Sequence, residues 1–376
     1  MDFREDAEQS RFRLELREWL KHNIPEGWQD ASTIEEQRAL RKSWHRSLYN
    51  AGYIGLSWPT EYGGRGLSPL YDAILNDEVG RVDAPYLPAV INFLGRAIFT
   101  YGTEEQKRTH LARMLSGEVQ WCQGFSEPGA GSDLASLRTR AELNGERYVI
   151  NGQKMWTSGA LTAEWCLVLV RTDTQVPKHK GISCLITPMD VPGIETRAIY
   201  LANGEPETCE VFFTDVEVPV ENRIGAEGQG WNIAMTTVSY ERGASDTGSI
   251  ARLRQQLRQL EQIAVQRGLD RQSDMRRRLA RAYVDVEVLA QNAAYQLSRR
   301  ISGHQAGPEG SIGKLLWSRA SQELMHTALE LTGADVLTGL MPEWLSDYFQ
   351  SRPVSVYGGS SQIQKNILAR MLELPR

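Results

Sequence analysis

The chain has 376 residues, of which 41% are hydrophobic and 24% are charged, a composition that allows a large core and more than one domain. Its net charge of −5 gives no electrostatic footprint for nucleic acid or an anionic membrane surface. No run approaches the roughly 20 apolar residues of a membrane span. The N-terminus carries Asp2, Glu5, Asp6 and Glu8 and lacks a signal peptide's apolar stretch, which favours a cytoplasmic protein.

Three segments of different periodicity follow one another. Residues 1–118 carry apolar side chains at helical spacing, for example Phe12 and Leu16, and predict a helical N-terminal domain. Residues 119–225 hold short β-branched and aromatic runs between turn residues, which predict a small β domain. In residues 226–376 the helical period returns and predicts a C-terminal helical domain.

Within these segments the elements can be placed in chain order. The glycine-rich stretch 58–66 predicts a loop. Asn144-Gly145 between two short runs predicts a hairpin. Further strands are expected at 165–171, 181–187 and 209–213, and long helices at 250–265, 275–298 and 312–331.

The order of the strands excludes several common enzyme classes. All of them lie in one central block, whereas a Rossmann domain alternates strand and helix. The sequence also lacks the phosphate-binding, nucleophile-elbow and H-E-x-x-H motifs. The four cysteines lie far apart without metal-ligand spacing, so no metal site is expected.

Three segments contain residues suited to ligand binding. Residues 124–133 read as a strand end that enters a glycine-rich loop, where hydroxyls and N–H groups can meet phosphate or ring oxygens. Residues 151–159 place an indole beside hydroxyl-bearing residues, which suits a planar cofactor. Residues 357–367 form a Gly-Gly-Ser-Ser turn that opens a helix. Taken singly, a structural turn, a core tryptophan and a helix cap explain these segments as well.

Together, in this order and at this separation, the three segments resemble those of the acyl-CoA dehydrogenase family. Matches at residues 58–66, 101–107, 210–219 and 374–376 extend the resemblance over nearly the whole chain. It implies an α+β fold: a helical N-terminal domain, a central β-barrel-like or sandwich-like domain, and a C-terminal four-helix bundle. It also implies FAD bound between the β domain and the bundle, in a homotetramer or homodimer.

The activity implied is the FAD-dependent conversion of an acyl-CoA thioester to a trans-2-enoyl-CoA, with electrons passed to an electron-transferring flavoprotein. Carried over by position, the cofactor contacts are Phe125, Ser126, Gly131, Ser132, Trp156, Thr157, Ser158, Glu330, Gly333, Ser360 and Gln362. The substrate contacts are Ser132, Arg242, Gly358 and Gly359. The turn at 330–333 would reach a neighbouring subunit's FAD.

The resemblance also points to the catalytic base. The reaction needs a group that takes the α-proton while a hydride leaves the β-carbon for flavin N5. Many members carry a glutamate directly after the tyrosine of the third segment, but this chain has Gly358 there. Isovaleryl- and long-chain-type members place the glutamate on a bundle helix, and Glu241 matches that site. We therefore expect Glu241 to be the base, the alternative being a surface ion pair with a neighbouring arginine.

Several points stay open at this stage. The R-x-x-F-G sequence that helps to hold the FAD pyrophosphate has no clear counterpart, and the arginines at 276–281 read as a solvated helix face. Relatives with this fold include acyl-carrier-protein dehydrogenases, oxidases, monooxygenases and non-catalytic subunits of mixed tetramers. Gly358 would leave room for a branched or bulky acyl group.

Overall fold

The computed structural model describes residues 5–374, apart from 32, 86, 88, 242–245 and 305–306. The chain forms two compact units. The first, the bundle unit, comprises Met1–Ile24, Leu67–Tyr86 and Arg242–Arg376. The second, the sheet unit, comprises Pro25–Gly66 and Leu87–Glu241. The helices of the N-terminal segment are therefore divided between the two units.

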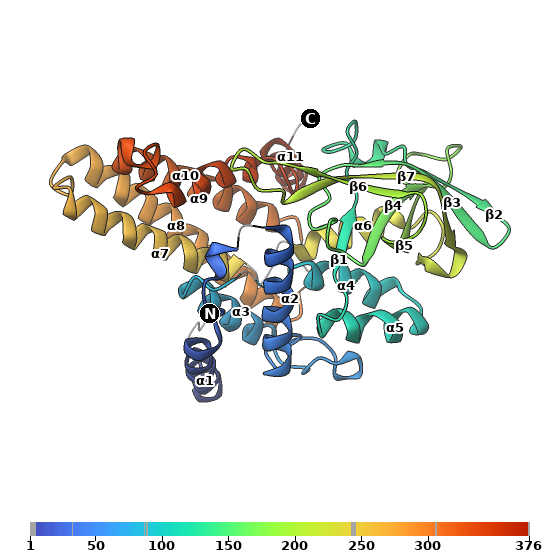
Figure 1. Ribbon diagram of the computed structural model, residues 1–376, viewed down its shortest axis with the longest axis horizontal. Helices are drawn as coiled ribbons and strands as arrows, with labels where there is room; N and C mark the ends of the chain where they lie inside the picture. Colours follow the sequence, from blue (N-terminus) through green and yellow to red (C-terminus); the bar gives the residue numbers. More distant parts are fainter. Residues whose placement is uncertain are drawn as a thin grey trace. The chain divides into compact units, whose positions relative to one another are not determined.

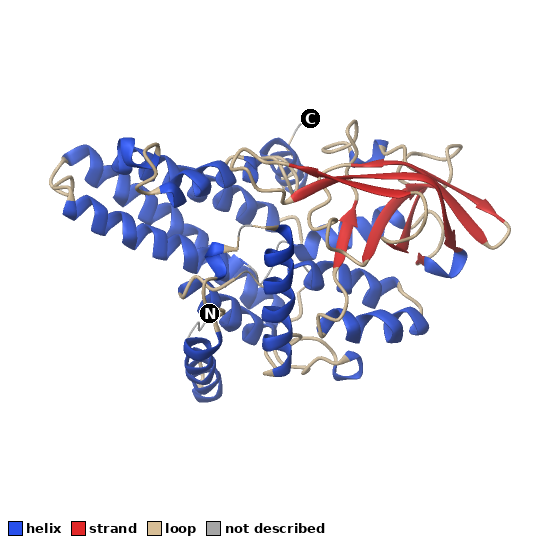
Figure 2. Cartoon of the chain, viewed as in Figure 1, coloured by secondary structure: helices blue, strands red, loops and turns tan. Residues whose placement is uncertain are grey.

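Within the described residues, the strands of the sheet unit form one eight-stranded sheet in the order β6-β7-β3-β2-β4-β5-β8, with β1 paired to β4 (Figures 1 and 2). Its strands are β1 (Trp121–Gly124), β2 (Arg140–Asn144), β3 (Arg147–Lys154), β4 (Trp165–Arg171), β5 (Ile182–Pro188), β6 (Ile194–Ile199), β7 (Thr208–Pro219) and β8 (Arg223–Ile224). Tyr148, Val168, Val211 and Phe213 are among the side chains of its core. Most neighbours are antiparallel, and β1 runs parallel to β4.

Helices of the sheet unit support this sheet. They are α2 (Ile34–Asn50), α4 (Ala89–Tyr101), α5 (Glu104–Leu115) and α6 (Gly230–Glu241). The helix α4 packs along α6, and the hydroxyls of Tyr101 and Thr236 join the two at 3.0 Å. The loop at 58–66 buries Trp58 against Gly95 of α4, where a Cβ would lie 2.1 Å from the indole. The helix α6 also packs on β5 and β4.

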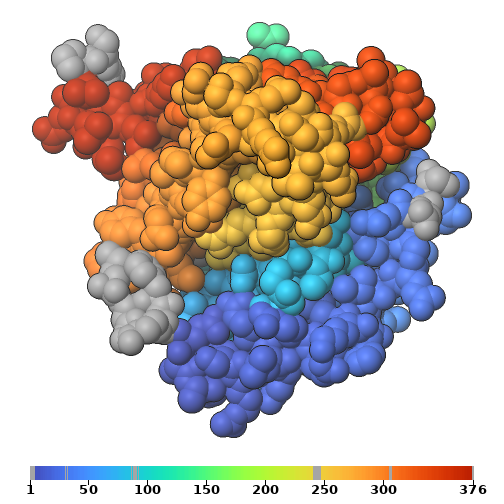
Figure 3. Space-filling view, turned by 90° about the vertical axis from the view of Figure 1, so that its left-hand side faces the viewer, coloured from blue at the N-terminus to red at the C-terminus, as the bar shows by residue number. Residues whose placement is uncertain are grey.

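The bundle unit is built from helices that pack against one another (Figure 1). They are α1 (Ala7–Asn23), α3 (Pro69–Arg81), α7 (Asp246–Gln266), α8 (Ser273–Ile301), α9 (Gly310–Thr332), α10 (Pro342–Ser351) and α11 (Ser361–Met371). Leu257, Val286 and Leu324 from α7, α8 and α9 meet in its core. Figure 3 looks onto the end of the bundle where α7 leads into α8. The helices α3 and α7 come close at Gly80, where a Cβ would lie 2.2 Å from the carbonyl oxygen of Gly248.

A buried carboxylate fastens α1 to α3. Glu78 of α3 is fully buried, and Arg13 and Arg17 of α1 approach its oxygens at 2.6 and 2.7 Å. Burial alone would raise the pKa of Glu78, but the hydrogen bonds from Arg17 and Arg13 outweigh it and lower that pKa to about 2. The contact between the two helices therefore depends on an ionised glutamate.

Most elements agree with the sequence-based predictions. The strands expected at 165–171, 181–187 and 209–213 are present as β4, β5 and β7, and the hairpin at Asn144-Gly145 joins β2 to β3. The helices expected from 250, 275 and 312 are present and slightly longer. The strand β6 was not predicted. No helix in the described part of the chain is both long and apolar enough to cross a bilayer.

Candidate active site

The first two predicted cofactor segments lie together in the sheet unit. The strand β1 ends at Gly124, where the first segment begins, and β3 ends at Lys154, within the second segment. The backbone N–H of Met155 donates to the carbonyl oxygen of Ser126 at 2.9 Å. The loop after β1 and the loop after β3 are thus joined although the two strands do not pair.

A buried ion pair reinforces this junction. The Nζ atom of Lys154, a fully buried side chain, donates to Oε1 of Glu127 at 2.9 Å and to the carbonyl oxygen of Phe125 at 3.1 Å. The carboxylate of Glu127 also accepts the N–H groups of Arg138 at 2.6 Å and Thr139 at 2.8 Å. Burial would raise the pKa of Glu127, but the charge of Lys154 outweighs it and holds that pKa below its ordinary value. Sequence reasoning did not assign a role to either residue of this ion pair.

The loop after β3 presents an indole and a hydroxyl. Trp156 has φ +63° and is 54% exposed, an unusual backbone and an unusual exposure for a tryptophan. Thr157 is fully buried, its N–H donates to the carbonyl oxygen of Cys209 at 3.0 Å, and its Oγ1 has no hydrogen-bond partner among the described residues. Ser158 is exposed. A planar ring with polar atoms would cover the indole and supply the partner that Oγ1 needs.

The loop after β1 gives backbone access to the same region. Phe125 is 4% exposed and anchors its start, and Ser126 is half-buried. Reciprocal backbone hydrogen bonds between Glu127 and Ala130 close a turn, after which Gly131 and Ser132 are exposed. A Cβ at Gly131 would meet nothing within 4 Å, so a ligand can approach this backbone closely.

The proposed base belongs to the same unit. Glu241 is the last residue of α6. Arg242, the predicted substrate contact beside it, lies outside the described residues. The sheet unit therefore contains the first two cofactor segments together with the helix that carries Glu241.

The third segment lies in the bundle unit. Gly358 and Gly359 have φ +61° and +91°, values that favour glycine. Ser360 follows as the N-cap of α11, its Oγ accepting the N–H of Ile363 at 3.3 Å. Gln362 is exposed on the first turn of that helix. Gln364, to which sequence reasoning gave no role, donates from Nε2 to the carbonyl oxygens of Gly358 and Gly359, both at 3.0 Å.

The turn predicted to reach a neighbour's cofactor closes α9. Gly333 has φ +58° and no atom within 4 Å of a Cβ built on it, and Glu330 pairs with Arg278 at 3.0 Å. Nη1 of Arg267 donates to the carbonyl oxygens of Leu331 and Thr332 at 2.9 Å. Arg267 was not singled out from the sequence, because it contacts backbone carbonyls, which every residue has and no sequence motif marks. The arginines at 276–278 and 281 are exposed.

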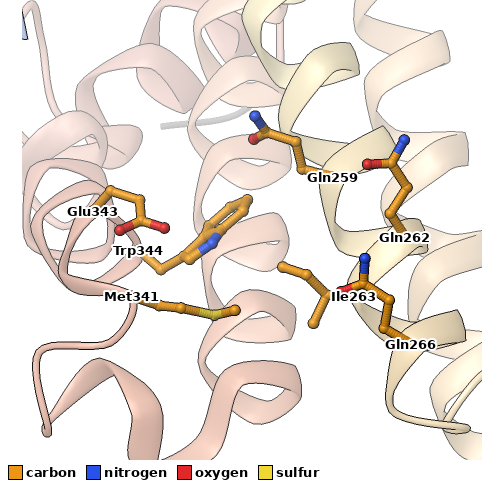
Figure 4. Close-up of a pocket in the computed structure, with 7 residues that line it drawn as sticks. All are labelled: Gln259, Gln262, Ile263, Gln266, Met341, Glu343 and Trp344. Atoms are coloured by element: carbon orange, nitrogen blue, oxygen red, sulfur yellow. The ribbon is translucent and has the colours of Figure 1, made fainter.

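The bundle unit also contains a cavity. It has a volume of about 230 Å³. Figure 4 shows Met341 and Trp344 facing Ile263 of α7 across it, with Glu343 beside them. Three glutamines of α7 complete the lining: Gln259, Gln262 and Gln266. None of the predicted site residues lines it.

Comparison with known protein families agrees with this arrangement. The chain matches the acyl-CoA dehydrogenase N-terminal domain over residues 6–118, the middle domain over 122–216 and the C-terminal domain over 228–373. The chain therefore belongs to the acyl-CoA dehydrogenase family and is an oxidoreductase that acts on acyl-CoA and uses FAD. The exposed Trp156, the unpaired Oγ1 of Thr157 and the open backbone at Gly131 fit such a cofactor.

One relative and two solved structures are similar to the chain over nearly its whole length. The chain is 38% identical to acyl-CoA dehydrogenase IpdE1 of Mycobacterium tuberculosis, with 97% of each chain covered. Among solved structures, it is similar to the steroid acyl-CoA dehydrogenase Tcur3481-Tcur3483, with 31% identity, a TM-score of 0.85 and full coverage of both chains. It is also similar to the ChsE4-ChsE5 complex from Mycobacterium tuberculosis, with 30% identity, a TM-score of 0.87 and full coverage of both chains.

Proposed function

We propose that the chain catalyses the α,β-dehydrogenation of an acyl-CoA thioester, with Glu241 as the base that takes the α-proton. One observation carries the proposal: the sheet unit holds the loop of Ser126 and the loop of Trp156 together, and its helix α6 ends at Glu241. The cofactor contacts expected in the first two segments and the position of the base thus belong to one folded unit.

The chain's own residues have three tasks in this reaction: to take the α-proton, to stabilise the thioester carbonyl oxygen and to hold FAD. FAD, when bound, supplies the acceptor for the hydride. Glu241 accepts the α-proton, and the N–H group of Gly358 donates to the thioester carbonyl oxygen, where negative charge develops as that proton leaves. Phe125, Ser126, Gly131, Ser132, Trp156, Thr157, Ser158, Ser360 and Gln362 are the residues that we expect to hold FAD.

We expect the acyl group to be branched or polycyclic. Gly358 places no side chain where many family members carry their base, and its φ of +61° favours glycine there. The similarity to a steroid acyl-CoA dehydrogenase favours the same substrate class. We further propose that electrons pass to an electron-transferring flavoprotein.

Two assemblies are compatible with this function. The first is a homotetramer or homodimer, in which the turn at 330–333 would contact a neighbour's FAD. The second is a mixed oligomer with another acyl-CoA dehydrogenase chain, which is favoured because the ChsE4-ChsE5 structure is a complex of two proteins. Mass measurement of the purified chain together with its FAD content would separate the two assemblies.

The test of the base compares the wild type with Glu241→Gln. Straight, branched and steroid-like acyl-CoAs are added anaerobically, and the loss of flavin absorbance is followed. We expect the variant to keep its FAD but to bleach about 10² to 10⁴ times more slowly, the usual contribution of a general base. Glu227→Gln, a half-exposed glutamate that precedes α6, is the matched control. Bleaching of Glu241→Gln at the wild-type rate would show that the base lies elsewhere, and a wild type without flavin would favour the mixed oligomer.

A further inference from the structure

Gln364 makes an unusual set of contacts for a residue near the start of a short helix. It is fully buried in the first turns of α11, and its Nε2 donates to the carbonyl oxygens of both Gly358 and Gly359 at 3.0 Å. Its Oε1 is buried with no partner among the described residues. The side-chain amide must be oriented with Nε2 toward the two carbonyl oxygens, because Oε1 in that place would face two other acceptors without a hydrogen between them. Both hydrogens of the amide nitrogen are thus directed at the two glycine carbonyls.

These hydrogen bonds determine where two backbone N–H groups point. In a trans peptide the C=O and N–H bonds are antiparallel, and the described chain contains no cis peptide. With the carbonyl oxygen of Gly358 held toward Gln364, the N–H of Gly359 points away from it. In the same way, the bond to Gly359 turns the N–H of Ser360 away. No acceptor for either N–H lies among the described residues.

We propose that Gln364 is a positioning residue. Its carboxamide fixes the turn at Gly358 and Gly359 so that the N–H groups of Gly359 and Ser360 together donate to one electron-rich oxygen of a bound ligand. That oxygen belongs either to FAD or to the thioester of the substrate. The inference rests on the proposed function, since it takes the turn to be part of the ligand site.

Gln364 contacts no reacting atom itself, so the experiment must separate positioning from packing. Three variants serve: Gln364→Met, Gln364→Asn and the control Gln106→Met. Met fills almost the volume of Gln without donors, whereas Asn keeps the donors and loses one methylene. Gln106 is a matched control because it is also buried and its Nε2 donates to two carbonyl oxygens, those of Glu221 and Arg223, far from the turn in sequence.

Two measurements on the purified holoenzyme distinguish the ligands. Release of FAD on dilution, followed by flavin fluorescence, reports on an oxygen of the cofactor. The values of kcat and KM with the acyl-CoA that bleaches the wild type fastest report on the thioester. We expect Gln364→Met to change one of these by about 10-fold or more, Gln364→Asn to change it less, and Gln106→Met to stay within about 2-fold of the wild type.

The measurement that changes identifies the ligand, and the relative impairment of the variants separates positioning from packing. Faster FAD release assigns the two N–H groups to the cofactor, and a lower kcat at unchanged FAD release assigns them to the thioester. If Gln364→Asn is impaired more than Gln364→Met, or if neither variant changes more than the control, packing explains Gln364 and the inference is wrong. Should Gln364→Met not fold, Gln364→Leu, which also lacks the donors, takes its place, and an effect of Gln364→Leu below 2-fold on both measurements would overturn the inference. Should no acyl-CoA bleach the wild type, the proposed function fails, and FAD release alone then decides the role of Gln364.

Discussion

Removal of the Lys154 ammonium should lower both the stability of the sheet unit and its affinity for FAD. The side chain is fully buried and contacts two neighbours, the carboxylate of Glu127 at 2.9 Å and the carbonyl oxygen of Phe125 at 3.1 Å. In Lys154→Met the carboxylate would keep only the N–H donors of Arg138 and Thr139. Leaving one partner of a buried ion pair without its counter-charge typically costs about 3 to 5 kcal/mol.

The stability lost in Lys154→Met should depend on pH and should be largest at neutral pH. In the wild type the charge of Lys154 outweighs burial and lowers the pKa of Glu127, so the pair stabilises the fold above the ordinary pKa of a glutamate and loses this effect as the pH falls below it. Without Lys154, burial dominates and raises that pKa. The variant is then most destabilised at neutral pH, and its deficit relative to the wild type should shrink between about pH 7 and pH 5.

Denaturant midpoints measured across this pH range, at fixed protein and FAD concentrations, test the argument. The double variant Lys154→Met/Glu127→Gln removes both charges, keeps an amide oxygen as acceptor for the N–H groups of Arg138 and Thr139, and should recover most of the lost stability. It should not recover the wild-type retention of FAD, because the loops of Ser126 and Trp156 would have lost their charged connection. Arg140→Met, which breaks an exposed pair on the same sheet, should cost less than about 1 kcal/mol. A deficit of Lys154→Met that is independent of pH, or no larger than that of Arg140→Met, would refute the reasoning.

Three further predictions concern the bundle unit. Glu78→Gln should lower the stability at pH 7 by about 3 kcal/mol, the equivalent of a pKa lowered from 4.5 to about 2, and denaturant titrations should show this difference beginning to shrink below pH 4.5. Burial and neighbouring carboxylates raise the pKa of Asp347 from 3.8 to about 6, which makes its ionisation unfavourable, so Asp347→Asn should raise the melting temperature at pH 7.5 and not at pH 4. Gly80→Ala should lower the melting temperature, because the new Cβ would lie 2.2 Å from the carbonyl oxygen of Gly248 and force two helices apart at a cost of about 1 to 3 kcal/mol. An unchanged melting temperature in Gly80→Ala would show that the helices separate freely.

The fold was largely predictable because its signals are local. The hairpin at Asn144-Gly145 needs a positive φ at Gly145, which has φ +60°, and the strand 165–171 is a continuous apolar run that the sheet buries. The strand β6 was not predicted because its apolar residues do not form a continuous run. Glu195 and Arg197, which are exposed at the edge of the sheet, interrupt them. The assignment of α1 to the bundle unit could not be predicted, since it depends on Glu78, 65 residues distant from Arg13 in sequence.

The site was predictable to the extent that its residues lie within recognisable segments. The structure joins the loops of Ser126 and Trp156 by a backbone hydrogen bond, and their assignment to the cofactor stays a prediction. The roles of Lys154, Gln364 and Arg267 could not be predicted, because each acts on backbone carbonyls. A carbonyl is present at every residue, so the sequence contains no sign of which one is contacted.

Lys154, Gln364 and Arg267 act in the same way, since each donates hydrogen bonds to backbone carbonyl oxygens of a turn. Each turn expected to touch a ligand has its backbone held by one buried or half-buried polar side chain: Lys154 for the two loops of the sheet unit, Gln364 for the turn at Gly358, and Arg267 for the end of α9. Backbone groups cannot be exchanged by substitution, so the direction in which they point can change only through such side chains or through the glycines themselves. Binding of FAD and substrate should therefore respond strongly to substitutions that contact neither ligand, and Glu241 should be the position where proton abstraction is lost while binding survives.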